Sequence, residues 1–212
     1  MEIPNTPRTI ISQLAGAEKS RVWNGAWRRF FDIYHAPIAL MVVGEFNSRG
    51  WYEVPPHIVD EVVSDVVVEL NKYFESGRYD ASKGKFRYLL KRMAMCRAMD
   101  YMRRNYKYLR AKSVELERER GADFESLSES AVKLDEQEER AFKRAMLLDA
   151  YETARLSFSP RTCLAFELIK LEGKPVDEVM KELGIDRNSA NNAVYRIMRK
   201  LKKIVSQDSA KG

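Results

Sequence analysis

Residues 79–112 read YDASKGKFRYLLKRMAMCRAMDYMRRNYKYLRAK, and this stretch decides the fold expected for the chain. A short polar turn over residues 79–85 precedes a long helix-forming run. Apolar side chains recur along that run at steps of three and four residues: Phe86, Leu90, Met93, Ala94, Ala98, Tyr101 and Met102. This spacing predicts a packed helix with one buried apolar stripe and cationic flanks.

Basic charge is concentrated in the same stretch. From Lys83 to Lys112 there are eleven Lys or Arg residues and one acid, Asp100, whereas the whole protein of 212 residues has a formal net charge of +6. So many like charges on one segment destabilise it by self-repulsion unless an anion is near. The pattern favours a polyanionic partner such as nucleic acid, and a merely solvated basic face is the alternative.

Length and composition leave room for one large or two small domains, because 45% of the residues are hydrophobic. No segment has the length of a membrane span and no cleavable signal pattern is present, so we expect a cytoplasmic protein. Cys96 and Cys163 lack partners at metal-ligand spacing, and His35 and His57 are isolated. We expect no metal site, no cofactor and no enzymatic activity, since no phosphate loop or nucleophile elbow stands out.

The N-terminal quarter predicts an arm followed by an aromatic helix. Residues 1–20 show little periodicity, so we expect a loosely ordered arm that becomes helical near residues 10–14. From Arg21 onward the large apolar positions follow helical steps: Trp23, Trp27, Phe30, Phe31, Tyr34 and Ile38, continued by Leu40 and Val43. Such a stripe is typical of a buried helix face. Residues 47–56, with Gly50 and two adjacent prolines, predict a connection.

Residues 58–74 predict a helix with an acidic face. The β-branched Val62, Val63 and Val66 would also suit a strand, but the apolar positions 59, 62, 63, 66, 70 and 73 keep a helical step. No Lys or Arg occurs between Glu53 and Asn71, and like charges at four-residue spacing destabilise a helix. The face therefore fits a basic partner or is simply solvated, with equal weight for both. Its acids are Asp60, Glu61, Asp65 and Glu69.

The composition reverses over residues 113–140, which hold ten acids and four bases and few large apolar residues. This composition predicts a flexible acidic linker. A negative tether between positive domains could also lie over a nucleic-acid groove and compete for it, a hypothesis that rests on charge alone.

Residues 141–205 predict a second helical domain. Ser159-Pro160 suits the N-cap and first turn of one helix. A helix over residues 175–183, a turn at Gly184 and a longer helix capped by Asp186 or Asn188 form the pattern of a helix-turn-helix. We expect a disordered tail over residues 206–212.

The second helix of such a motif enters the major groove of DNA and presents its N-terminal residues to base edges. Side chains able to pair with bases or phosphates crowd this helix, and no acid occurs between Arg187 and Lys203. An ordinary surface helix with a basic end is the alternative. The candidate DNA contacts are Arg187, Asn188, Ser189, Asn191, Asn192, Tyr195, Arg196, Arg199 and Lys200.

Taken together, these segments resemble the extracytoplasmic-function sigma factors, two-domain bacterial proteins of the sigma-70 family. The resemblance covers residues 9–201 and rests on the order and spacing of its matches. The first half matches at the aromatic positions of residues 27–38 and at DEVVSDV (60–66), YDASKGKFR (79–87) and DYMRR (100–104). The second half matches at FSPRT (158–162), AF (165–166), EGKP (172–175), EV (178–179) and ELGI (182–185).

The resemblance implies an all-α protein with two small helical domains, residues 21–112 and 141–205, joined by the flexible acidic linker. It implies promoter DNA and core RNA polymerase, through the β′ clamp and the β flap, as partners, and it leaves an anti-sigma factor open. The polymerase-binding residues would be Asp60, Glu61, Asp65 and Glu69. The first domain would hold the minus-ten element with one flipped base, and the helix-turn-helix would read the minus-thirty-five element. The minus-ten residues would be Lys83, Lys85, Phe86, Arg87, Lys91, Arg92, Cys96, Arg97, Arg103 and Arg104.

The sequence departs from the family pattern at four positions. Leu89 stands where the family often has Trp, and Cys96 stands where it often has the Asn that helps to select the flipped base. Ser64 replaces a usual Gln of the clamp helix, and Asn191 replaces a frequent basic residue. These departures concern specificity rather than overall function.

Two other kinds of protein stay open. A stand-alone helix-turn-helix regulator would explain residues 175–204, but it would not need the acidic helix, the basic helix and an acidic tether together. A helical adaptor without a nucleic-acid role would leave both basic segments unexplained.

Overall fold

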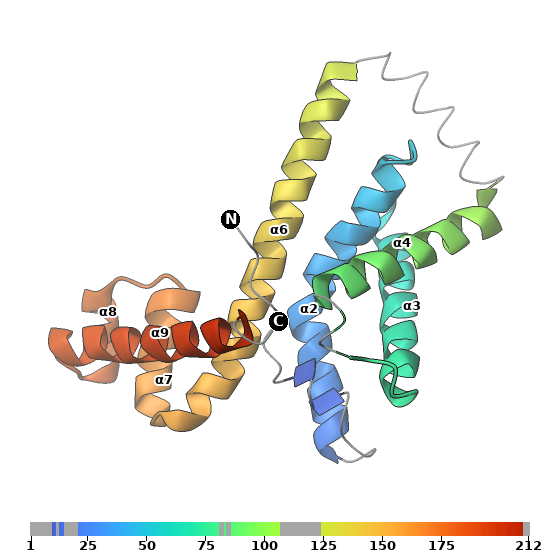
Figure 1. Ribbon diagram of the computed structural model, residues 1–212. Helices are drawn as coiled ribbons and strands as arrows, with labels where there is room; N and C mark the ends of the chain where they lie inside the picture. Colours follow the sequence, from blue (N-terminus) through green and yellow to red (C-terminus); the bar gives the residue numbers. More distant parts are fainter. Residues whose placement is uncertain are drawn as a thin grey trace. The chain divides into compact units, whose positions relative to one another are not determined.

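The protein is described by a computed structural model that covers residues 10–11, 13–14, 21–80, 83, 86–106 and 124–209. These residues form helices, turns and connections and contain no strand (Figure 1). The prediction of an all-α protein is therefore confirmed. None of the described helices combines the length and the apolar character needed to cross a membrane.

Backbone contacts divide the described residues into two compact units. The N-terminal unit is Ile10–Ala145, and the C-terminal unit begins at Met146. The division falls inside one long helix, α6 (Phe124–Ala154), so that the two parts of α6 belong to different units.

Three helices of the N-terminal unit pack pairwise: α2 (Arg21–Asn47), α3 (Pro56–Glu75) and α4 (Phe86–Arg104) (Figure 1). Phe30, Tyr34 and Ile38 of the predicted α2 stripe lie at the centre of this bundle. Contrary to the prediction, Phe31 is 40% exposed, and Trp23 and Trp27 are only partly buried. The Phe30 ring is 4.8 Å from that of Tyr34 and 6.1 Å from that of Phe86. The buried residues of α4 are the seven of its predicted apolar stripe, which confirms that prediction.

The β-branched stretch before α4 is a helix, as its period predicts. Helix α3 follows the Pro-Pro pair, with Pro56 in its first turn, and it buries Val62, Val63 and Val66 against the bundle. Proline suits this position because its missing N–H is one that a helix start leaves unpaired anyway.

The C-terminal unit is built from the end of α6, α7 (Pro160–Phe166), α8 (Val176–Leu183) and α9 (Arg187–Ser209). A single turn of 3-10 helix, Arg155–Ser157, and a π-helical stretch, Glu167–Leu171, lie on either side of α7. The Ser159 side chain accepts a hydrogen bond from the backbone N–H of Thr162, so it caps α7 as predicted.

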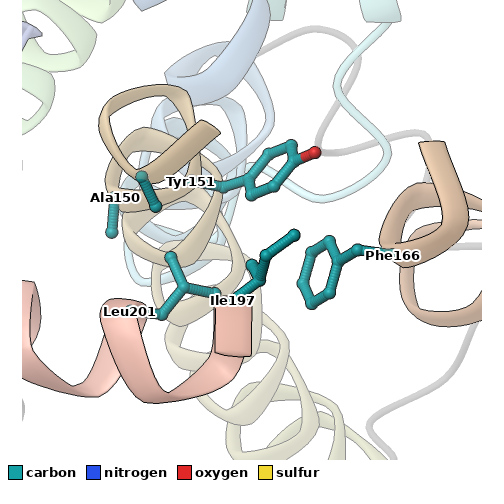
Figure 2. Close-up of a cluster of buried hydrophobic side chains, with 6 residues drawn as sticks. Ala150, Tyr151, Phe166, Ile197 and Leu201 are labelled. Carbon is teal, nitrogen blue, oxygen red and sulfur yellow. The ribbon is translucent and has the colours of Figure 1, made fainter. Parts of the chain in front are cut away.

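A cluster of buried side chains from α6, α7 and α9 forms the core of this unit (Figure 2). The rings of Tyr151 and Phe166 are stacked with their centroids 5.0 Å apart, and Ile197 and Leu201 of α9 complete the cluster. The apolar positions of α9 thus hold it against the unit and fix which of its faces stays exposed.

The predicted linker differs from the structure over residues 124–140, which are helical and belong to α6. Residues 107–123, which include the end of the predicted first domain and the start of the linker, lie outside the described residues. Composition pointed to a tether because residues 113–140 have few apolar side chains. Part of this segment nevertheless has partners in the N-terminal unit, described below.

Both predicted chain ends are partly described. Residues 10–11 and 13–14 are helical as expected, and Ile10, Ile11 and Leu14 are buried rather than part of a loose arm. At the other end, residues 206–209 of the predicted tail continue α9.

Candidate nucleic-acid interface

Six cations flank the buried stripe of α4, and we call them together the cationic face: Arg87, Lys91, Arg92, Arg97, Arg103 and Arg104. Arg92, Arg103 and Arg104 are exposed, and the other three are partly buried. Lys83 precedes the helix, is exposed and lies 3.7 Å from the carboxylate of Asp80. Lys85 lies outside the described residues. These cations lie on two flanks of the packed helix: Arg87 and Lys91 face α6, whereas Arg97, Arg103 and Arg104 line a groove beside α3.

Of the other predicted minus-ten residues, Phe86 is buried and Cys96 is partly exposed. Phe86 is 2% exposed, and its ring contacts Phe30, Tyr34, Phe74 and Tyr79. It is therefore a core residue that supports the loop before α4, and a base does not reach its ring in this conformation. The Cys96 thiol is free and partly exposed.

Arg87 and Lys91 both bind Glu138 of α6. Arg87 donates from Nη2 to Oε1 of Glu138 at 2.7 Å and from Nε to the same oxygen at 3.3 Å, and Lys91 Nζ donates to Oε2 at 3.1 Å. Glu138 is 3% exposed, although it comes from the stretch predicted to be a tether. Both carboxylate oxygens are thus used, and two cations are not free for a ligand in this conformation.

The far end of the cationic face meets the acidic face of α3, which we define as Asp60, Glu61, Asp65 and Glu69. Arg104 Nη2 lies 3.3 Å from Asp65 Oδ2, while Arg97 and Arg103 pair with Asp100 on their own helix. A shallow groove of about 540 Å³ runs between the two faces and includes the exposed Val68. A partner in this groove would meet charges of both signs.

The acidic face is only partly paired. Asp60 Oδ1 lies 3.2 Å from Nε2 of His35, and Asp65 pairs with Arg104. All four of these side chains are at least 35% exposed. Exposed ion pairs of this kind contribute about 0–1 kcal/mol, so a stronger partner can replace them. No described residue forms an ion pair with Glu61 or Glu69.

A helix-turn-helix is present in the C-terminal unit. Helix α8 ends at Gly184, whose φ of 60° lies in the left-handed region that glycine adopts without a Cβ clash. Arg161 of α7 holds the turn from outside, because its Nη2 donates to the backbone carbonyls of Leu183 and Gly184. This role of Arg161 was not predicted, and no local pattern in the sequence indicates it.

Asp186 caps α9, which decides between the two predicted caps. Its Oδ1 accepts a hydrogen bond from the backbone N–H of Ser189 at 2.6 Å, and its Oδ2 accepts one from the Ser189 hydroxyl at 3.1 Å. These hydrogen bonds, that from the backbone N–H first, lower the pKa of Asp186 below its ordinary value. The Ser189 hydroxyl is therefore engaged in the cap rather than free for a base.

The side of α9 that faces away from the core has polar and cationic side chains and no acid between residues 187 and 203. We call its exposed members the reading face: Arg187, Asn188, Ser189, Asn191, Asn192, Tyr195, Arg196 and Arg199. Lys200 is partly buried. The predicted DNA contacts thus share one exposed surface of the second helix of the motif.

Two arginines of the reading face already have partners. Arg187 pairs with the exposed Asp177 of α8, and the guanidinium of Arg196 lies 5.5 Å from the ring centroid of Phe158. The second contact orients Arg196 without neutralising its charge.

A buried tyrosine anchors the motif to α6. Tyr151 donates from its hydroxyl to Oε1 of Glu167 at 2.8 Å, next to the π-helical stretch. Burial, and then this hydrogen bond, raises the pKa of Tyr151 above its ordinary value. This pair was not predicted, because Tyr151 and Glu167 are 16 residues apart and belong to different helical segments.

The described residues contain no group of three or more His, Cys, Asp or Glu side chains that could hold a metal ion. No protein-family model matches this sequence, and the comparison with curated proteins finds no match either. The case for any function therefore rests on the surfaces described above.

Proposed function

We propose that this chain is a sigma factor that binds core RNA polymerase and directs it to promoters by contacting the minus-ten and minus-thirty-five elements. The observation that carries the proposal is the reading face of α9, a surface of exposed Arg, Asn and Tyr side chains on the second helix of a helix-turn-helix. Arg pairs with guanine and Asn with adenine in the major groove, so these residue types suit base recognition.

The N-terminal unit supports the same proposal. The cationic face of α4 suits the phosphates of a DNA strand, and the acidic face of α3 lies beside it and suits a basic protein partner. A stand-alone regulator needs the reading face only. The proposal therefore depends on both units acting on one promoter together with the polymerase.

The decisive experiment mixes the purified chain with core RNA polymerase and tests binding and run-off transcription. We expect a stoichiometric complex that initiates at a defined site on DNA fragments selected by the complex. A chain that binds duplex DNA alone and adds no promoter-specific initiation to the polymerase would instead be a stand-alone regulator.

The acidic face is tested by reversing its two unpaired charges. Glu61→Lys with Glu69→Lys should abolish polymerase binding without loss of helix content, because neither carboxylate forms an ion pair with a described residue. Asp32→Lys, an equal change per site at an exposed position of α2, should leave binding unchanged. Equal binding by the reversed protein would remove the acidic face from the polymerase interface.

The reading face is tested by two substitutions with different expected effects. Arg187→Ala should relax the preferred sequence, because Arg187 lies at the start of α9 where base edges are met. Lys202→Ala should keep the preference and flatten the salt dependence by about one phosphate contact. An unchanged preferred sequence in the Arg187 variant would show that another register of α9 meets the bases.

A further inference from the structure

The first part of α6 is packed against the cationic face. Leu134 Cδ2 lies 3.8 Å from the position that a Cβ on Gly44 of α2 would take, so the two helices approach closely there. Four residues after Glu138, Phe142 is 1% exposed and its ring lies 6.0 Å from that of Tyr34. Leu134, Glu138 and Phe142 therefore form one stripe at four-residue steps that contacts the bundle.

Glu138 occupies the middle of this stripe and receives three hydrogen bonds from two cations. The Arg87 side chain is 17% exposed and that of Lys91 is 43% exposed, and both approach the carboxylate from successive turns of α4. The Arg87 guanidinium also lies 5.7 Å from the centroid of the Phe142 ring. A guanidinium and an ammonium group that converge on one oxyanion are the donors by which proteins bind phosphate.

We infer that Arg87 and Lys91 form a phosphodiester-binding site that Glu138 fills in the free protein, so that single-stranded DNA binds there only when α6 leaves. The inference rests on the proposed function for the identity of the polyanion. It adds that the acidic stretch regulates the same surface: α6 is a displaceable cover, and its carboxylate stands in for a phosphate.

Two features make this cover displaceable. The first is solvent access, because an open pocket of about 300 Å³ lies beside α6, lined by Met41, Gly44, Tyr52 and Leu134 among others. The second is electrostatic: removing both partners of an ion pair from water costs much of what their attraction returns. Exchange of the Glu138 carboxylate for a phosphate therefore changes the free energy little, and the main cost is the loss of the apolar contacts of Leu134 and Phe142.

Single-stranded DNA offers that competition. Arg92 follows Lys91 on α4, is exposed and forms no ion pair with any residue that the structure describes. A strand that reaches Arg92 gains a contact that Glu138 cannot provide.

The test uses the full chain with two matched variants. Glu138→Gln keeps the shape of the side chain and removes its charge, whereas Glu136→Gln makes the same change at an exposed residue that pairs with Arg140 on its own helix. Binding of a fluorescent single-stranded oligonucleotide is measured by anisotropy. We expect Glu138→Gln to raise the affinity at least about tenfold, because a binding-competent state that is rarely populated lowers the apparent affinity in proportion. Glu136→Gln should match the wild type.

A second measurement needs no substitution. Hydrogen exchange of residues 134–142 in the wild-type chain should become faster when the oligonucleotide is added, because the helix loses its contacts to α2 and α4. Unchanged or slower exchange in the bound chain would overturn the inference, as would equal affinities for the two variants, or no binding of single-stranded DNA even by Glu138→Gln.

The outcomes separate this inference from the proposed function. If DNA displaces α6 but the chain does not bind or direct RNA polymerase, the sigma-factor proposal fails and the covered phosphodiester site stands. If transcription is promoter-specific but Glu138→Gln binds no better than Glu136→Gln, the inference fails alone.

Discussion

The strength of the contact between Arg87 and Glu138 can be measured by a double-mutant cycle in which each is replaced by Ala, singly and together. Breaking a buried ion pair by removing one partner costs about 3–5 kcal/mol, whereas an exposed pair contributes about 0–1 kcal/mol. With side chains 17% and 4% exposed, Arg87 and Glu138 lie near the buried limit. Glu138→Ala should therefore lower the free energy of unfolding by about 3 kcal/mol.

The coupling energy of the cycle should be smaller than that loss, because each single variant also leaves the other group unpaired. Hydrogen bonds to charged groups contribute about 1.5–3 kcal/mol, and we expect a coupling in that range for Arg87 with Glu138. Lys91 is more exposed, so its coupling to Glu138 should be below about 1 kcal/mol. The ordering of these two couplings is the specific expectation.

Tryptophan fluorescence is suited to the measurement. All three tryptophans, Trp23, Trp27 and Trp51, belong to the N-terminal unit. Urea unfolding followed by their emission therefore reports the unit that contains the contact and not the helix-turn-helix. A coupling below about 0.5 kcal/mol for Arg87 with Glu138, the usual limit of additivity, would refute the claim that α6 is held by this pair. A larger coupling energy of Glu138 with Lys91 than with Arg87 would refute the arrangement in which Arg87 is the more buried partner of Glu138.

Three further predictions concern local structure. Gly184→Ala should destabilise the C-terminal unit by about 1–2 kcal/mol because its φ is left-handed. Gly25→Ala, in the second turn of α2 with open space around it, should stabilise the N-terminal unit by roughly 0.5–1 kcal/mol. Thermal unfolding followed by circular dichroism and by tryptophan emission measures both. Tyr151→Phe removes the hydrogen bond to Glu167 and should cost about 1.5 kcal/mol in urea unfolding, and no loss would mean that water replaces it. The pKa of Asp186 is lowered in the folded state. The stabilisation by Asp186 should therefore be complete above the ordinary pKa of 3.8 and should disappear as the pH falls through the folded-state pKa. The difference in free energy of unfolding between wild type and Asp186→Ala, measured against pH, should vanish in acid and persist at neutral pH.

Most of the fold could be predicted from the helical spacing of apolar residues, because this spacing determines which face of each helix is buried. Val62, Val63 and Val66 favour strands by intrinsic preference, yet their helical spacing outweighed it, since a helix lets all three contact the same core. The cap at Asp186 followed from local chemistry in the same way: a short acceptor placed just before the helix can reach the free N–H groups of its first turn.

The stripe of Leu134, Glu138 and Phe142 was not predicted, and the reason is physical. A carboxylate in the middle of a stripe marks that face of a helix as solvent-exposed when it is judged from sequence alone. Only the tertiary position of Arg87, 51 residues earlier in the chain, makes burial of Glu138 tolerable, because a buried charge needs a partner. Pairing between distant residues has no local signal in one sequence, so composition alone predicts a tether over residues 124–140.

Because of ion pairs of this kind, the net charge of α4 overstates how many cations of the cationic face are free to bind an anion. Five of its six cations form ion pairs with Glu138, Asp100 or Asp65, and Arg92 is the exception among the described residues. In the proposed function, DNA binding would exchange carboxylate for phosphate rather than fill a bare surface, and its affinity would be set by the difference between two similar interactions.

This exchange should discriminate between anions by the number of cations that each anion can contact at once. Glu138 is attached to the same chain, so it competes as an intramolecular group. Inorganic phosphate gains only the Arg87 and Lys91 contacts and loses the competition, whereas a DNA strand adds the contact to Arg92. Exchange of residues 134–142 should therefore stay slow in millimolar phosphate at constant ionic strength and become fast with the oligonucleotide. Equal acceleration by both would mean that α6 opens through screening of charge and not through occupation of its site.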